Sequence, residues 1–210
     1  MIAKEFFSVE SPWIFAEHFS LEENPVQWLS GIGAAIAWAI GIFPQAKRDR
    51  PAGCHIGKDA FIHESVQLPP VCVIDGPAYI GEGTTIRPFA YIRGNAIIGK
   101  NCLVGNSCEL KNSILLDGVQ IPHFNYVGDS VLGNFVHLGA GVILANLRLD
   151  KMEITARYGE KRIPTGLRKM GAIVGDYSEI SCNSVINPGT ILPKKSMIFG
   201  GIARKMGEFR

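Results

Sequence analysis

The feature that most constrains this chain is an aliphatic residue that recurs every six positions. Ten consecutive hexads begin with one, at Ile56, Ile62, Leu68, Ile74, Ile80, Ile86, Ile92, Ile98, Val104 and Leu110. The residue four positions after each is mostly small, as in Ala60, Ala78 and Cys102. A fixed six-residue period is typical of a parallel β-helix, in which three hexads form one triangular coil. The sequence therefore predicts an all-β fold of stacked coils, with the aliphatic and small residues pointing inward.

The hexads continue almost to the C-terminus, with one long interruption over residues 147–171. The interrupting segment is rich in basic residues, and its stretch MEITARY alternates polar and apolar side chains. Such alternation favours extended structure, so we predict that the insertion is a two-stranded excursion from the β-helix. We assign residues 51–200 to the β-helix and residues 201–210 to a C-terminal tail.

Residues 1–50 lie outside the repeat and include the apolar, uncharged segment WLSGIGAAIAWAIGIF, residues 28–43. This segment is shorter than the roughly 20 residues that span a bilayer. Its Ala and Ile residues favour a helix, whereas its glycines weaken one. We expect a short α-helical cap on the first coil, because a solenoid needs covered ends. The alternative is that residues 28–43 form a membrane-associated helix. The opening MIAKEFFSVE lacks the layout of a signal peptide.

Composition excludes several classes of function. The formal net charge is only +2, which gives no argument for nucleic acid as a partner. The five cysteines are odd in number and form no CxxC pair, so we expect no disulfide framework and a reducing, cytoplasmic compartment. Cys72, Cys102 and Cys108 occupy the small inward position, where we expect them to fill the core.

The period breaks on both sides of the segment IPHFNYVGDS, residues 121–130. Successive aliphatic positions are five residues apart at Leu110–Leu115 and again at Val127–Leu132. Shorter steps tighten the corners of a coil and redirect the side chains beside them. We therefore interpret this segment, which carries His123 and Tyr126, as a candidate site.

The stretch from Arg87 to Asn146, which contains IPHFNYVGDS and LGAG, resembles a known acetyltransferase domain. It is that of the bifunctional glucosamine-1-phosphate N-acetyltransferase and N-acetylglucosamine-1-phosphate uridyltransferase family. The insertion is similar to that of the archaeal-type branch, and the resemblance covers roughly residues 55–200. It implies a left-handed parallel β-helix, a homotrimer, and acetyl-CoA bound between subunits. No uridyltransferase domain precedes the repeat, so we do not expect that second activity.

The resemblance also implies a role for each matching residue. His123 matches the general base that takes a proton from the sugar amine. Asn146 matches the Asn beside that amine, and the N–H of Ala140 matches the donor to the thioester carbonyl. The residues that match the substrate-binding positions are Arg93, Lys111, Tyr126, Glu109 and His137.

Two features depart from the family pattern or extend it. His137 stands where the family usually has Asn, which leaves the acceptor sugar open. Arg204 and Lys205 resemble the basic ending that many hexapeptide acyltransferases place near coenzyme A phosphates, although a solvated tail is the competing interpretation.

We therefore predict an acetyl-CoA-dependent N-acetyltransferase that acts on an amino-sugar 1-phosphate by direct attack, with no metal requirement and no membrane span. The alternative is a catalytically silent relative that binds a sugar nucleotide or serves as a scaffold. A zinc carbonic anhydrase built on the same repeat is disfavoured, because the His pair five residues apart that such enzymes need is missing.

Overall fold

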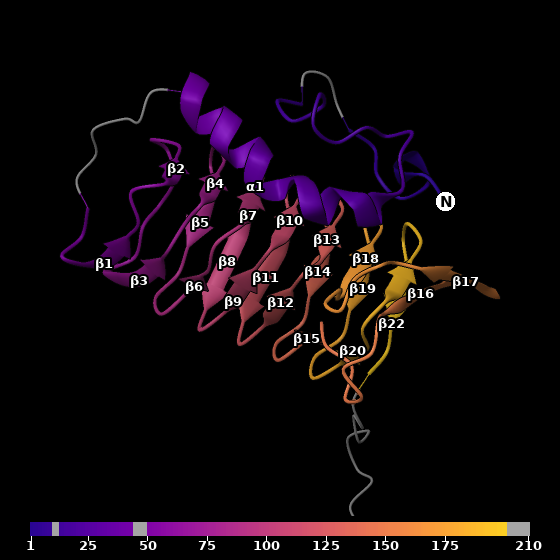
Figure 1. Ribbon diagram of the computed structural model, residues 1–210. Coiled ribbons are helices and arrows are strands. Elements are labelled where there is room, and N and C mark those ends of the chain that lie inside the picture. Colours follow the sequence, from indigo (N-terminus) through magenta and orange to yellow (C-terminus); the bar gives the residue numbers. More distant parts are fainter. Residues whose placement is uncertain (10–12, 44–49, 201–210) are drawn as a thin grey trace, which may run out of the picture.

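Three parallel sheets wrap around one core in the computed structural model, which describes residues 1–9, 13–43 and 50–200. The architecture is the left-handed parallel β-helix predicted from the sequence (Figure 1). We call the sheets A, B and C. A coil passes through sheets A, B and C in turn before it rises to the next coil.

Each sheet contains one short strand from most coils. Sheet A consists of β1 (Gly53–Ile56), β3 (Val71–Ile74), β6 (Tyr91–Ile92), β9 (Glu109–Lys111), β12 (Tyr126–Gly128), β15 (Ile143–Leu144) and β20 (Val185–Ile186). Sheet B consists of β2 (Ala60–Ile62), β4 (Ala78–Ile80), β7 (Ala96–Ile98), β10 (Ser113–Leu115), β13 (Val131–Leu132), β18 (Ala172–Val174) and β21 (Thr190–Leu192), extended by β16 (Thr155–Tyr158) and β17 (Lys161–Pro164). Sheet C consists of β5 (Thr85–Ile86), β8 (Leu103–Asn106), β11 (Gln120–His123), β14 (His137–Leu138), β19 (Glu179–Ile180) and β22 (Met197–Ile198).

The strand register explains the break in the sequence period. Ile92 pairs with Leu110 at a separation of 18 residues, as three hexads require. Leu110 then pairs with Val127, and Val127 with Leu144, at a separation of 17 residues each. Shortened coils thus keep the aliphatic residues stacked. The five-residue steps in the sequence therefore mark shorter coils and not a loss of the repeat.

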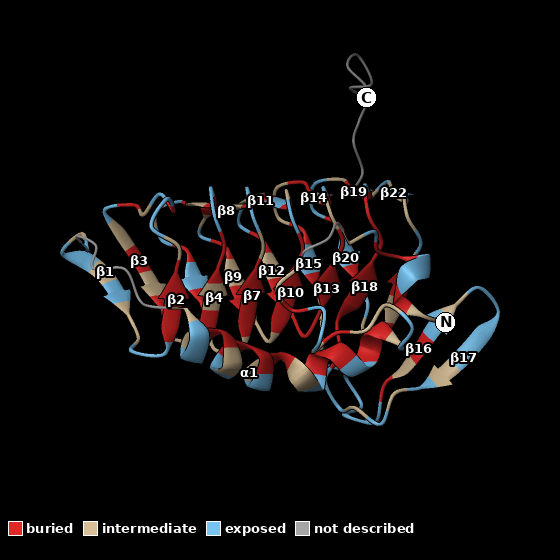
Figure 2. Cartoon of the chain, turned by 90° about the horizontal axis from the view of Figure 1, so that it is seen from above, coloured by how far each residue is buried: buried red, intermediate tan, exposed pale blue. Residues whose placement is uncertain are grey.

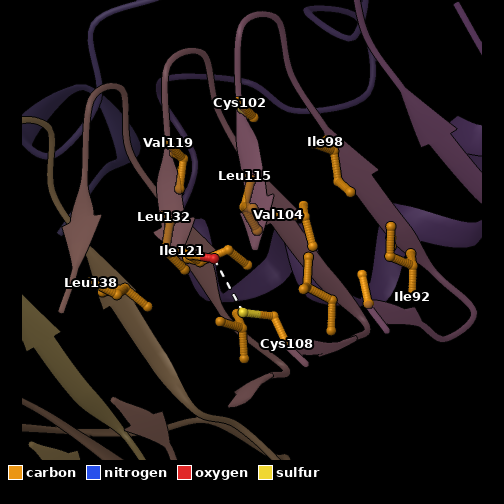
Figure 3. Close-up of a cluster of buried hydrophobic side chains, with 14 of the residues drawn as sticks. Ile92, Ile98, Cys102, Val104, Cys108, Leu115, Val119, Ile121, Leu132 and Leu138 are labelled. Atoms are coloured by element: carbon orange, nitrogen blue, oxygen red, sulfur yellow. Dashed lines mark hydrogen bonds between the residues drawn. The ribbon is translucent and has the colours of Figure 1, made fainter. Parts of the chain in front are cut away.

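The interior contains the inward residues predicted from the hexads, and they form one continuous cluster (Figure 3). Cys72, Cys102 and Cys108 are buried, which confirms that they fill the core. The Cys108 thiol lies 3.1 Å from the carbonyl oxygen of Ile121 in the next coil. Burial raises the pKa of Cys102 to about 12 and also raises the pKa of Cys108, so both thiols stay protonated at neutral pH.

The N-terminal helix α1 (Pro25–Ile42) forms as expected, but its predicted position on the first coil is wrong. It lies along the flank of sheet B, where it contacts β2, β4, β7 and β10 (Figures 1 and 2). Trp28, Ile32 and Ile36 are buried there. Meanwhile β1 on the first coil stays partly exposed.

Helix α1 lies along sheet B because the outward side chains of that sheet are apolar. The inward hexad positions give no information about these outward residues. Ile97, Ile114 and Ile173 point away from the β-helix interior and pack in the same cluster as α1. Burying two extended apolar surfaces against each other removes more apolar area from water than covering one coil end does. By length and mean hydropathy (1.4), α1 could cross a membrane, and 44% of that stretch is buried here.

The chain begins at the opposite end of the β-helix from the first coil (Figure 1). A short 3-10 helix, η1 (Ala3–Glu5), precedes Phe6, whose ring meets that of Tyr158 edge-on at 5.2 Å. The N–H of Ser8 donates to the buried carboxylate of Asp176 at 2.6 Å. The insertion forms the antiparallel pair β16–β17, which confirms the two-stranded excursion.

Candidate functional site

The corner between sheets C and A places equivalent residues of successive coils one above the other. These residues are Asn106, His123, Ala140 and Cys182. The N–H of Gly141 donates to the carbonyl of His123 at 3.0 Å, and the N–H of Asn183 donates to the carbonyl of Ala140 at 2.8 Å. Adjacent strands lie about 4.8 Å apart. The structure thus brings His123 and Ala140, which are 17 positions apart in sequence, into neighbouring coils.

Asn125 secures this corner, although it was not among the site residues predicted from the sequence. Its side-chain oxygen accepts from the N–H of His123 at 3.1 Å, and its side-chain nitrogen donates to the carbonyl of Gly139 at 2.7 Å. Asn125 is buried, whereas the His123 side chain is exposed. The available signal was an amide side chain at an inward position, four residues after Ile121, where most other hexads carry Ala, Cys, Ser or Thr.

The outward face of sheet A carries a polar strip made by Arg93, Glu109, Lys111 and Tyr126. Arg93 donates to Glu109 at 2.9 Å, and this bond raises the pKa of the Arg93 guanidinium. Tyr126 pairs in register with Glu109 on the neighbouring strand. Desolvation, followed by the nearby carboxylate of Glu109, raises the pKa of the Tyr126 phenol, which therefore stays protonated.

Asp129 ends the strip at the corner between sheets A and B, and it too was missed. Its buried carboxylate lies 3.2 Å from the Lys111 ammonium and accepts from the Asn112 side chain at 2.9 Å. The side-chain amide of Asn146 also donates to it. Asp129 therefore fixes the positions of Lys111 and Asn146, two residues singled out from the sequence.

Gly128 provides the space in which these groups meet. A Cβ at this position would lie 2.6 Å from the Tyr126 hydroxyl and 2.7 Å from the Asn146 amide nitrogen. Both distances are shorter than van der Waals contact, so no larger residue fits without moving the site. The glycine lets Tyr126 and Asn146 approach across the strip.

The remaining predicted residues lie elsewhere. His137 is on β14 in sheet C, where its Nδ1 lies 2.8 Å from Glu179. Together with Cys182, which is exposed and so is not a core cysteine, His137 lines a cavity of about 230 Å³. Within one chain, the structure does not bring His137 to the polar strip on sheet A. Arg204 and Lys205 lie outside the described residues.

His123 and the polar strip offer two kinds of chemistry. An imidazole nitrogen can accept or donate a proton, and the cations of the strip can bind an anionic group. Over residues 1–9, 13–43 and 50–200, no group of three or more His, Cys, Asp or Glu side chains is arranged to hold a metal ion.

A family profile described as the GMPPB C-terminal domain matches residues 74–199. A bifunctional sugar-1-phosphate nucleotidylyltransferase/acetyltransferase from Sulfurisphaera tokodaii is 36% identical over 152 residues, which make up 67% of this chain and 38% of that protein. The bifunctional protein GlmU of Prochlorococcus marinus is 38% identical over 137 residues, 64% of this chain and 27% of GlmU. The chain thus spans well under half the length of these relatives.

A solved structure has the same fold. The crystal structure of the Bacillus cereus BC4754 gene product superposes with a TM-score of 0.52 and 21% sequence identity. The superposition covers 66% of this chain and 72% of that chain. At this identity, the likeness concerns the β-helix alone.

Proposed function

Since this chain belongs to the GMPPB C-terminal domain family, and a relative is named a sugar-1-phosphate nucleotidylyltransferase/acetyltransferase, we propose that it is an acetyl-CoA-dependent N-acetyltransferase. Its acceptor is an amino-sugar 1-phosphate. The observation that carries the proposal is the stacking of His123 on Ala140 beside a strip of cationic and polar side chains. This stacking supports the proposal, because acyl transfer to an amine needs a proton acceptor and, close to it, a donor for the developing oxyanion.

The reaction proceeds by direct attack. The sugar amine forms a bond to the thioester carbonyl carbon as the His123 imidazole takes a proton from it. The N–H of Ala140 stabilises the negative charge that develops on the carbonyl oxygen. Among the described residues, no backbone carbonyl accepts from this N–H, so it is free for that role. The carbonyl then re-forms as the carbon–sulfur bond breaks, and the proton held by His123 passes to the leaving sulfur, so that coenzyme A leaves as its thiol.

Arg93 and Lys111 bind the phosphate of the acceptor. Each cation faces a carboxylate in the ligand-free chain, Glu109 and Asp129 respectively. A phosphate dianion that approaches the strip shares these cations with the carboxylates, because each cation carries several N–H donors. Tyr126 and Asn146 lie across Gly128 from each other, where the sugar ring would rest.

We further propose that the active unit is a homotrimer. Sheet B is covered by α1, whereas the outward face of sheet A leaves Tyr91, Ile143 and Val185 exposed. Phe124, beside His123, is exposed as well. Exposed apolar side chains on one face are typical of a surface that meets another chain. Sedimentation velocity of the wild type and of Val185→Lys tests this, since a lysine there should shift a trimer toward monomer.

A thiol-release assay with acetyl-CoA and glucosamine 1-phosphate tests the proposed reaction. Two matched compounds define what is recognised: glucosamine lacks the phosphate, and N-acetylglucosamine 1-phosphate lacks the free amine. The proposal predicts thiol release with glucosamine 1-phosphate, less with glucosamine and none with the acetylated compound. Absence of turnover with every amino-sugar phosphate would favour the silent binding protein instead.

A further inference from the structure

A second concave site lies beside the polar strip, at the junction of α1 and the insertion. This pocket has a volume of about 560 Å³. Leu29 of α1 and Leu147 and Leu167 of the insertion supply its apolar lining, and Lys151, Arg168 and Lys169 supply three cations. These apolar and cationic residues come from segments outside the hexad repeat, and Asn112 and Asp129 of the repeat complete the lining. Neither the repeat nor the groups assigned to acetyl transfer accounts for it.

The pocket carries positive charge that no acidic side chain neutralises. Lys151, Arg168 and Lys169 form no ion pair with any described carboxylate. The single acidic residue that lines the pocket, Asp129, is buried and already bound to Lys111 and two amides. By contrast, Arg93 and Lys111 on the strip each have a carboxylate partner. Lys151, Arg168 and Lys169 are therefore available to bind an anion at the pocket.

The cationic wall is fixed to the site by backbone hydrogen bonds. The N–H of Met170 donates to the carbonyl of Asn146 at 3.0 Å, and the N–H of Gly171 donates to the carbonyl of Asp129 at 2.8 Å. These bonds tie the end of the insertion, immediately after Arg168 and Lys169, to the two residues that terminate the strip. The anion-binding wall is thus joined to the acceptor site by backbone hydrogen bonds.

We infer that this pocket binds a second phosphate group and the nucleoside attached to it. The acceptor is then an amino-sugar 1-phosphate unit carried in a nucleoside diphosphate sugar. This inference rests on the proposed function. Arg93 and Lys111 suffice for the first phosphate, and the cations of the insertion serve the second. The leucines of the pocket offer an apolar surface to the nucleoside, the usual combination in a ligand site.

Calorimetric titration of the full chain with inorganic pyrophosphate measures the affinity of the protein for a diphosphate, and variants of the pocket show whether it binds there. The double variant Arg168→Gln with Lys169→Gln removes two of its cations and should weaken pyrophosphate binding about tenfold or more. The matched control is Lys161→Gln with Arg162→Gln, an exposed pair on β17 of the same insertion that lines no part of the pocket. The control should bind as the wild type does. Equal weakening in both variants, or in neither, would overturn the inference.

Steady-state kinetics with two acceptors separates this inference from the proposed function. Uridine-diphosphate glucosamine and glucosamine 1-phosphate share the amine and the first phosphate. The pocket variant should lower kcat/KM about tenfold for the nucleotide-linked acceptor and leave it nearly unchanged for the monophosphate. An equal loss for both acceptors would refute the second-phosphate role while the acetyltransferase proposal stood. If neither acceptor turned over, the proposed function would fail. Pyrophosphate titration would still show whether the pocket binds a diphosphate.

Discussion

The side chain of Asn125 accepts a hydrogen bond from the backbone N–H of His123 at 3.1 Å. The same side chain donates to the carbonyl of Gly139, the residue before Ala140, at 2.7 Å. One buried amide thus links the proposed base to the proposed oxyanion donor. This link explains why a polar residue occupies an inward position of the coil.

Replacing Asn125 by alanine should disturb both the fold and the site. The change leaves the N–H of His123 and the carbonyl of Gly139 without their partner, which should lower the free energy of unfolding by about 2 kcal/mol. The corner should also lose its alignment, so kcat should fall more than KM rises. Urea denaturation and steady-state kinetics measure the two effects. A loss of stability with kcat unchanged would show that Asn125 only supports the fold.

Gly128→Ala tests the geometry of the polar strip. The added Cβ would lie 2.6 Å from the Tyr126 hydroxyl and 2.7 Å from the Asn146 amide, so both side chains must move. We expect a raised KM for the acceptor and an unchanged KM for acetyl-CoA. Gly41→Ala is the control, because nothing lies within 4 Å of its Cβ position, and alanine there should stabilise the helix by about 0.5 to 1 kcal/mol. Normal acceptor kinetics in Gly128→Ala would argue against the strip as the acceptor site.

Asp176 is predicted to hold the N-terminal segment on the last coils. Its buried carboxylate accepts from the N–H of Ser8 at 2.6 Å and from the N–H of Asn134 at 2.7 Å. Asp176→Ala should therefore lower the free energy of unfolding by about 3 kcal/mol and expose residues 1–9 to proteases. Asp150→Ala, which removes an exposed carboxylate from the insertion, should leave both properties nearly unchanged. Equal proteolysis of the two variants would contradict this role.

The buried thiol of Cys102 predicts a loss of stability at alkaline pH. Burial raises its pKa from 9.0 to about 12 in the folded chain. A raised folded pKa contributes stability that is fully present below pH 9.0 and declines as the pH rises toward 12, because the unfolded thiol ionises first. Denaturation from neutral pH to about pH 11 should show a shallower decline in Cys102→Ala than in the wild type. Parallel curves would show that this thiol does not contribute.

The sequence predicted the coils well because their physical cause is local and periodic. Each aliphatic residue in the interior stacks on its equivalent one coil away, so a six-residue period specifies the core. The position of α1 could not be read in the same way, since it depends on outward residues such as Ile97 and Ile114 that are far apart in sequence. The triplets AII, SIL and AIV in sheet B, which are apolar on both faces, were the overlooked signal.

The sequence predicted individual residues of the candidate site but not the contacts that join them. Lys111 and Asn146 were singled out, and the structure reveals that Asp129 joins them. A buried carboxylate between three donors has no periodic signature. The pocket at the insertion is likewise a product of tertiary contact, because Leu29 and Arg168 meet only after α1 folds back along the β-helix.

The most direct test of the central claim compares His123→Ala with His137→Ala in the acetyl transfer assay, under saturating acetyl-CoA. If His123 is the general base, its removal should lower kcat by about 10² to 10⁴-fold. His137, which is paired with Glu179 on the neighbouring strand of sheet C and lies away from the polar strip, should mainly change KM. Both variants remove an imidazole that is at least partly exposed, so neither should unfold the chain. An unchanged kcat in His123→Ala, in a protein that still turns over, would contradict the mechanism.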